Sequence, residues 1–281
     1  MVHGVAVVTD STAALPAGVL DKYDVTVVPL QVVLGGRVGA EGVDVTSADV
    51  AAALAARTSV STSRPSPGVF ASTYADLAAA GAAAIVSVHI SAGLSGTIEA
   101  ARLAAADAPV PVHVVDSRST AMGLGFPALA AAEAAAGDAT AEVVVATAAA
   151  AVRRTRTLFY VDSLDALRRG GRLGQAAALV GAALLVKPLL QVSDGRIGML
   201  EKVRTSARAI ARLEDVVAAE AGAGAVDVAV HHLGAPARAE ALADRLRSRL
   251  PGLQTAHVSE VGAAVGAHVG VGLLGVVVHH R

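Results

Sequence analysis

Cysteine and tryptophan are absent from the 281 residues, and aromatic residues make up only 2%. Without cysteine the chain forms no disulfide, thiolate nucleophile, cysteine-ligated zinc site or iron–sulfur cluster. So few aromatic side chains cannot build a stacking surface for single-stranded nucleic acid. The formal net charge of −1 also gives no basic surface for phosphate backbones. We therefore expect no nucleic-acid partner.

No apolar run in the sequence is long enough to cross a membrane, although the mean hydropathy is high at +0.57. The run Ala176–Val186 is short of the roughly 20 apolar residues that a bilayer requires. The run Val261–Val278 is interrupted by glycines and by His268, which is typical of a buried loop and strand. Residues Met1–Gly4 lack the basic region of a signal peptide. We expect a cytoplasmic protein without stable membrane insertion.

Common catalytic motifs are also missing from the sequence. It contains no phosphate-binding G-x-x-x-x-G-K-[ST] loop, no H-E-x-x-H motif and no G-x-S-x-G motif. The pairs His231-His232 and His279-His280 suggest metal ligands, but neighbouring residues of a strand point to opposite faces. We therefore expect no metal site, no cofactor and no catalytic residues.

The chain is nevertheless rich in core-forming residues, with 54% hydrophobic and 17% charged residues. In the first half, short apolar runs alternate with helical stretches. The predicted strands are Gly4–Thr9, Val25–Pro29, Ile85–His89 and Val112–Asp116. The predicted helices start at Thr46 with a capping box to Asp49, at Ser66-Pro67, at Ser95, and before Met122. This alternation predicts a parallel sheet with helices on both faces.

The second half has a different pattern. Its predicted strands are Leu158–Val161, Leu189–Val192, Ile197–Glu201, Val226–His231 and Thr255–Ser259, and the second and third of these form a hairpin around Asp194-Gly195. Its predicted helices are a short one capped by Ser163, an apolar one over Leu173–Val186, one capped by Thr205 and one over Ala235–Leu250. We predict a two-domain α/β protein, with an N-terminal parallel-sheet α/β domain at residues 1–155 and a C-terminal α+β domain at residues 156–281.

Hydroxyl-bearing residues form four clusters beside the predicted strands. They are Thr9–Thr12, Ser61–Pro67, Ser91–Thr97 and Asp116–Thr120. The crevice outside the carboxyl ends of parallel strands is a usual ligand site. Hydroxyls and free helix N–H groups there suit an anion such as a carboxylate or a phosphate. Helix capping explains any one cluster on its own better than a ligand does, but four clusters at equivalent strand ends favour a site.

Two further segments contain polar residues for which the sequence leaves two roles open. The glycine-rich segment Gly262–Gly272 is predicted to be a loop, and its His268 is either a buried structural histidine or a residue that faces the site. Arg168, Arg169 and Arg172 form a basic patch, which is either a solvated face or a docking surface for an acidic partner or phosphate. Because Gly170-Gly171 end the preceding helix, we expect this patch to project from the surface.

Eight segments, in order along nearly the whole chain, resemble the DegV family of bacterial fatty-acid-binding proteins. They are TDST (9–12), TSRPSPG (62–68), SAGLSGT (91–97), DSRSTAMGLG (116–125), VDSLDALRRGGRLG (161–174), KPLL (187–190), KVRT (202–205) and GAHVGVGLLG (266–275). Arg64, where the family usually has Gln, and Ala92, where it commonly has Ser, depart from the pattern.

The resemblance implies a long-chain fatty acid held between two domains. It also implies a fatty acid kinase partner that phosphorylates the bound carboxylate, while the binding protein has no nucleotide site. By motif match, Thr62 and Ser95 hold the carboxylate, with Ser95 favoured over Ser91, and His268 lies near it. The full set of implied fatty-acid-binding residues is Thr62, Ser63, Ser91, Ser95, Gly96 and His268. Arg172 matches an arginine that serves the encounter with the kinase.

Two other functions stay open at this point. One is a stand-alone phosphotransferase or hydrolase that uses Asp10 as its nucleophile, because Asp10 follows the first strand. Thr12 occupies the position where such enzymes carry a second acid. The other is a lipid sensor that works without a kinase.

Overall fold

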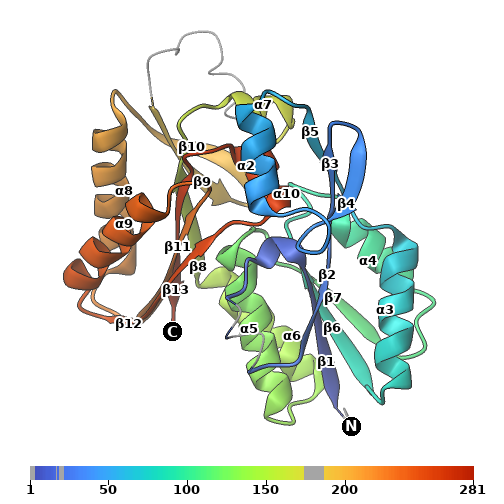
Figure 1. Cartoon of the computed structure of the whole chain (residues 1–281). Helices are drawn as coiled ribbons and strands as arrows, with labels where there is room; N and C mark the ends of the chain where they lie inside the picture. Colours follow the sequence, from blue (N-terminus) through green and yellow to red (C-terminus); the bar gives the residue numbers. More distant parts are fainter. Residues whose placement is uncertain (1–3, 17, 19–21, 174–186) are drawn as a thin grey trace.

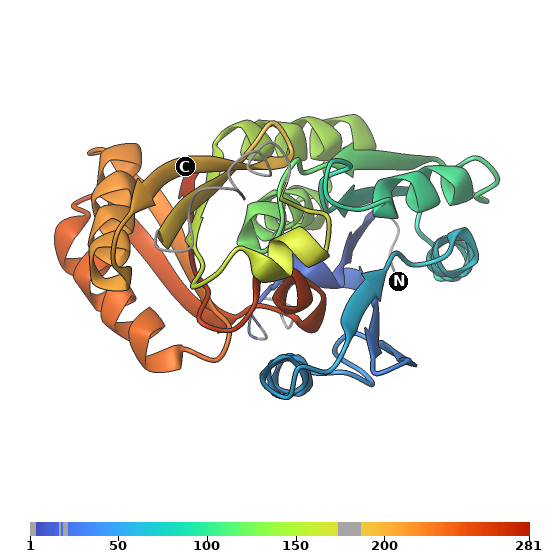
Figure 2. The same cartoon turned by 90° about the horizontal axis from the view of Figure 1, so that it is seen from above.

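The computed structural model describes residues 4–16, 18, 22–173 and 187–281. Its two large sheets lie side by side (Figures 1 and 2), and a third, smaller sheet has three strands. The predicted apolar helix over 173–186 lies, beyond Leu173, outside the described residues. None of the described helices is both long and apolar enough to cross a bilayer.

The first sheet has four parallel strands in the order β2-β1-β6-β7. Its strands are β1 (Val5–Asp10), β2 (Val25–Val28), β6 (Ala84–His89) and β7 (Val112–Asp116). The helices on it are α3 (Pro67–Ala79), α4 (Thr97–Ala105), α5 (Met122–Ala136) and α6 (Ala141–Arg153). Ala6 and Val8 pack with α3 and α4, whereas Val7 packs with α5 and α6. The predicted parallel sheet with helices on both faces is confirmed.

The second sheet has six strands in the order β10-β9-β8-β13-β11-β12, and only β11 and β12 pair in parallel. Its strands are β8 (Thr155–Tyr160), β9 (Lys187–Ser193), β10 (Arg196–Val203), β11 (Val226–His232), β12 (Leu253–Glu260) and β13 (Leu274–His280). The predicted hairpin is confirmed as β9–β10. Asp194 (φ 50°) and Gly195 (φ 75°) both have the positive φ angles of a type I′ turn.

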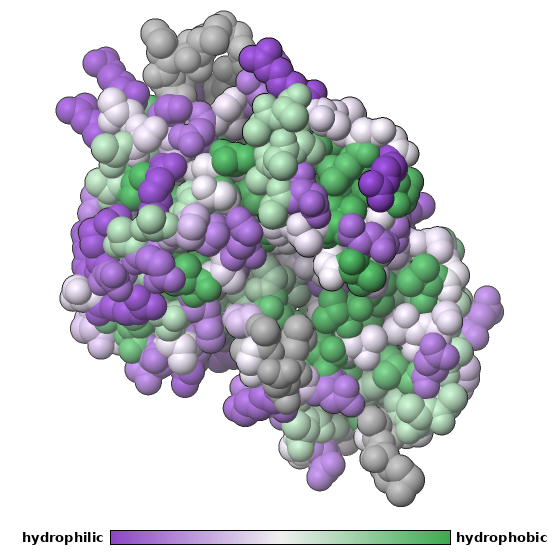
Figure 3. Space-filling model, viewed as in Figure 1, coloured by the Kyte–Doolittle hydropathy of each residue, from purple (hydrophilic) through white to green (hydrophobic). Residues whose placement is uncertain are grey.

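Helices α8 (Ser206–Ala221) and α9 (Pro236–Arg249) cover one face of the six-stranded sheet. Hydrophilic side chains cover their outer side, along the left edge of the face in Figure 3. Ion pairs such as Arg245–Glu214 and Arg249–Asp215, both 2.7 Å, join the two helices there. The arginines of these pairs are exposed to solvent, so each pair contributes little stability, and the buried apolar face holds the helices to the sheet.

Helix α5 lies between the two sheets (Figures 1 and 2). Leu124 and Ala128 pack on the four-stranded sheet, while Met122 and Phe126 pack on Ala229 and Val277 of the six-stranded sheet. A helix that is buried on both sides must be apolar all round, which explains the run MGLGFPALAAA. The shared helix places the carboxyl edge of the first sheet against the second sheet.

A small antiparallel sheet, in the order β4-β3-β5, was not predicted. It consists of β3 (Gln31–Leu34), β4 (Arg37–Ala40) and β5 (Val60–Ser63), with α2 (Ser47–Ala55) beside it. Residues 61–63, which the sequence marked only as part of the hydroxyl cluster that precedes a helix, belong to β5, and α3 does follow the cluster at Pro67. The small polar side chains of residues 61–63 give no alternation of apolar and polar residues that would predict a strand. They form a strand because they pair with β3, which supplies the backbone hydrogen bonds.

Helix starts were predicted with mixed success. Side-chain caps form at Thr46, Ser66 and Thr205, as expected. At α4 the cap position belongs to Gly96, and at α7 (Asp165–Arg169) it belongs to Leu164. Ser95 and Ser163 lie one residue earlier and still accept backbone N–H groups, from Thr97 and Asp165.

The segment predicted as a glycine loop contains a short helix, α10 (Ala263–Val269). Ala263, Ala264 and Ala267 have high helix propensity and are buried in a cluster with Val50 of α2. Gly270, with φ at 82°, ends the helix. Tertiary packing of an alanine face therefore makes this segment helical despite its glycines.

Candidate functional site

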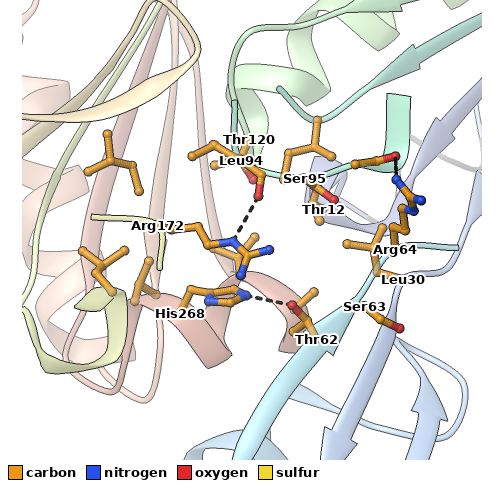
Figure 4. Close-up of a pocket in the computed structure, with 17 residues that line it drawn as sticks. Thr12, Leu30, Thr62, Ser63, Arg64, Leu94, Ser95, Thr120, Arg172 and His268 are labelled. Carbon is orange, nitrogen blue, oxygen red and sulfur yellow. Dashed lines mark hydrogen bonds between the residues drawn. The ribbon is translucent and has the colours of Figure 1, made fainter. Parts of the chain in front are cut away.

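A cavity of about 220 Å³ lies between the two halves of the molecule (Figure 4). From the first half it is lined by Thr12, Leu30, Thr62, Ser63, Arg64, Ile90, Leu94, Ser95, Gly96 and Thr120. From the second half it is lined by Leu167, Arg172, Ile197, Ala264, Val265, His268 and Val269. All four hydroxyl clusters contribute to its wall, and most of the remaining wall is apolar.

Thr62 and His268 meet at the polar end of the cavity. Thr62 lies on β5 and His268 on the last turn of α10, and Thr62 Oγ1 is 2.7 Å from His268 Nε2. Strand β5 and helix α10 lie together through the alanine-rich face of the helix. The small sheet and α10 thus bring together two residues that are 206 positions apart.

His268 is neutral near pH 7. Burial, together with the nearby positive charge of Arg172, lowers the pKa of its imidazole to about 4. Its Nδ1 is buried and has no hydrogen-bond partner within the described ranges. Gly170 lies against this nitrogen so closely that a Cβ at position 170 would collide with it. The ring is therefore held between Thr62 on one side and the glycine turn on the other.

Arg172 lines the cavity beside His268 (Figure 4), so the expectation that it projects from the surface is wrong. Its Nε donates to Leu94 O at 3.1 Å, and one terminal nitrogen donates to Gly170 O at 2.5 Å. Gly171, at φ 69°, turns the chain back, whereas Arg168 and Arg169 remain exposed. The turn that was expected to expose the patch directs Arg172 inward.

The hydroxyl groups divide into cavity residues and supporting residues. Ser63 and Ser95 line the cavity, and Ser95 Oγ is 2.8 Å from Thr97 Oγ1. Ser91 does not line it. The buried Ser91 hydroxyl instead donates to Gly195 O at 2.7 Å and ties the loop to the β9–β10 turn.

Gly96 gives Arg64 room at the cavity wall. A Cβ at position 96 would collide with the Arg64 guanidinium, which donates to Gly96 O and forms a 2.9 Å ion pair with Glu99. Glycine at this position therefore lets an arginine lie across the backbone next to Ser95.

Asp10 is fully buried and does not line the cavity. Its carboxylate accepts the N–H groups of Thr12 and Ile90 and lies 3.0 Å from His89 Nδ1. These bonds orient the turn that carries Thr12 into the cavity wall. Across the described residues, no group of three or more histidine, aspartate or glutamate side chains could hold a metal ion.

Glu41 supports the site and was missed in the sequence. It is only 5% exposed, accepts the hydroxyl of Ser11, and accepts Ala264 N–H at 2.8 Å at the start of α10. Burial raises the pKa of this carboxyl group, and its two hydrogen bonds oppose that shift. No spacing or motif around Glu41 marks it, because its partner lies 223 residues away.

Comparison with known proteins agrees with this geometry. A family model described as an uncharacterised protein of the DegV family matches residues 4–281. A DegV domain-containing protein of Streptomyces coelicolor is 58% identical over 281 residues, which is 100% of both chains. The chain belongs to the DegV family.

Solved DegV structures have the same fold. A fatty-acid-binding DegV family protein from Thermus thermophilus matches with a TM-score of 0.93 at 31% identity, over 99% of both chains. DegV of Bacillus subtilis, also a fatty acid binding protein, matches with a TM-score of 0.90 at 31% identity, again over 99% of both chains. The α/β fold expected from the DegV resemblance, with a parallel sheet in the first half and a mixed sheet in the second, is therefore confirmed, while the division into domains at residue 155 stays a prediction.

Proposed function

We propose that this DegV protein binds a long-chain fatty acid in the cavity and presents its carboxylate to a fatty acid kinase for phosphorylation to an acyl phosphate. The observation that carries the proposal is one cavity with a polar end, at Thr62, His268 and Arg172, and an otherwise largely apolar wall. In this proposal the carboxylate lies at the polar end, and the hydrocarbon chain runs along Leu94, Ile197 and their neighbours.

The polar end suits a carboxylate rather than a neutral head group. Arg172 supplies a positive charge, and Thr62 and Ser95 supply hydroxyl donors. The single N–H group of the neutral His268 ring, placed on Nε2, donates to Thr62 Oγ1 and leaves the Thr62 hydroxyl free to donate to the carboxylate. Hydrogen bonds to a charged group contribute about 1.5–3 kcal/mol each. The apolar wall adds about 0.8 kcal/mol for each methylene group that it removes from water.

A second, polar cavity supports the presentation step. It measures about 710 Å³ and shares Thr62, Arg172 and His268 with the first cavity. Its wall also contains the arginines Arg57 and Arg169. A carboxylate at the shared residues would be reached from this side by a phosphate donor, and arginines suit phosphate oxygens. The proposal implies a cytoplasmic location, because the kinase needs ATP.

Native mass spectrometry tests the binding half of the proposal. We expect the purified protein to carry the mass increment of a single fatty acid, and the delipidated protein to regain it when a fatty acid is added. Neither retention nor uptake would overturn the proposed function.

Incubation with ATP and a fatty acid kinase catalytic protein tests the second half. We expect acyl phosphate only when both proteins are present, and no ATP turnover by the binding protein alone. Binding without acyl phosphate formation would favour a lipid sensor. ATP turnover that follows the binding protein through purification would favour an independent enzyme.

A further inference from the structure

A small apolar cavity continues the first one into the molecule. It measures about 50 Å³, and Thr120, Ile197, Val265 and Val269 line both cavities. Beyond these shared residues, the small cavity is lined by residues of the six-stranded sheet, among them Phe159, Gly275 and Val277. A hydrocarbon chain whose carboxylate lies at the polar end would therefore point toward this small cavity.

Gly275 forms part of the wall of the small cavity. It lies on β13 directly between Phe159 of β8 and His231 of β11, and paired residues of neighbouring strands share a face of the sheet. Glycine between two large side chains leaves a notch in that face. His231 and Phe159, which also line the cavity, form the two sides of the notch.

Neither backbone geometry nor crowding requires glycine at position 275. Its φ lies outside the left-handed region. A Cβ there would lie 3.6 Å from His231 Cβ, 3.7 Å from Phe159 Cβ and 3.8 Å from Leu158 O, which are ordinary contacts. Glycine weakens a strand interior and often marks close approach by a ligand. The missing side chain leaves space at the end of the apolar path.

Beyond the notch the surroundings become polar. Thr157 and Val192 line both the small cavity and a fourth cavity of about 490 Å³, whose wall contains Arg153 and Arg156. The hydroxyls of Ser119 and Thr157 are 2.9 Å apart at this boundary. Moving the methyl end of a fatty acid into a polar cavity gives no favourable free energy of burial, so the boundary at Thr157 limits how far a hydrocarbon chain extends.

We propose that Gly275 sets the acyl chain length that the protein accepts, by leaving the notch between Phe159 and His231 that receives the methyl end of the fatty acid. This inference rests on the proposed function, because it needs a fatty acid whose carboxylate lies at Thr62 and His268. The ligand class it names is a long, unbranched acyl chain whose last carbons lie over β13.

Binding of myristate, palmitate and stearate to delipidated protein, measured by calorimetry, tests the inference. Gly275→Ala and Gly275→Val fill the notch, and we expect them to weaken stearate binding more than myristate binding. Each displaced methylene costs about 0.8 kcal/mol, which is about a fourfold loss of affinity. Phe159→Leu widens the notch and should shift the preference toward longer acids. Gly198→Ala, on β10 and outside all four cavities, is the matched control.

The outcomes separate the inference from the proposed function. If the wild-type protein binds none of the three acids, the proposed function fails. If it binds them and Gly275→Ala weakens all three equally, or none, the inference fails while the binding function stands. Thermal unfolding checks that each variant is folded. If Gly275→Val does not fold, Gly275→Ala and Phe159→Leu still test the inference, because they are expected to shift the preferred acyl chain length in opposite directions.

Discussion

The carboxylate of Glu41 accepts the backbone N–H of Ala264 at 2.8 Å and thereby joins the end of β4 to the first turn of α10. Helix α10 carries His268 into the cavity, so a buried acid from the first half of the chain holds a site residue of the second half. A Cβ at Gly262 would collide with this carboxylate, which shows how closely the chain passes it.

Glu41→Ala should destabilise the protein and weaken fatty acid binding. The substitution leaves the buried N–H of Ala264 without its acceptor, which costs about 1–3 kcal/mol. Glu41→Gln is the matched control. It keeps an acceptor oxygen, and because burial raises the pKa of Glu41, losing the charge is not expected to cost stability. Chemical denaturation measures both variants, and equal unfolding free energies for Ala, Gln and wild type would contradict the role given to Glu41.

Thr62→Val combined with Ser95→Ala should weaken fatty acid binding by well over tenfold. Each substitution removes a hydroxyl from the cavity wall, and a hydrogen bond to a carboxylate contributes about 1.5–3 kcal/mol. Ser91→Ala is the control, because the Ser91 hydroxyl is bonded to Gly195 O and does not line the cavity. Calorimetric titration decides. An unchanged affinity in the double variant, or a larger loss in Ser91→Ala, would remove Thr62 and Ser95 from the carboxylate site.

Arg172→Ala should reduce both fatty acid affinity and acyl phosphate formation. The guanidinium lines the fatty-acid cavity as well as the polar cavity, so its loss removes a charge from the proposed head-group site. We expect at least a tenfold weaker affinity, from the loss of a charge-assisted bond worth about 1.5–3 kcal/mol. Arg169→Ala, which touches only the polar cavity, should bind lipid normally. Normal lipid affinity with lost phosphorylation in Arg172→Ala would assign Arg172 to the kinase encounter alone.

Stability should fall as the pH is lowered from about 6.5 toward 4. Burial lowers the pKa values of His231 and His268 from 6.5 to about 4, so the unfolded chain takes up protons in this range while the folded protein does not. Above pH 6.5 their contribution is complete. Each such histidine adds at most about 1.4 kcal/mol per pH unit to the slope.

Denaturant unfolding of His268→Gln across this pH range provides the measurement. The variant should show a shallower pH dependence than wild type, because one of the titrating groups is gone. His113→Gln, which changes a histidine outside the four cavities, serves as the comparison. A slope in His268→Gln equal to that of wild type would contradict the lowered pKa of His268.

The sequence by itself determined the features that depend on neighbouring residues. Apolar runs and capping residues indicated the parallel sheet with its helices, Thr46 with Asp49 formed the expected capping box, and Asp194-Gly195 formed the expected hairpin turn. These interactions span only a few positions, so local conformational preference and hydrogen bonding decide them. The hydroxyl clusters of the first sheet were also predictable, because parallel strands bring their carboxyl ends to one edge.

Only the tertiary structure decided which polar groups face the cavity. Residues 61–63 become a strand through pairing with β3, and α10 becomes a helix through packing on α2. The contacts Thr62–His268 and Glu41–Ala264 join residues more than 200 positions apart. Arg172 turns inward where a local pattern indicated the surface. Such placements depend on the burial and hydrogen bonding of distant segments against each other, and no local spacing in the sequence encodes them.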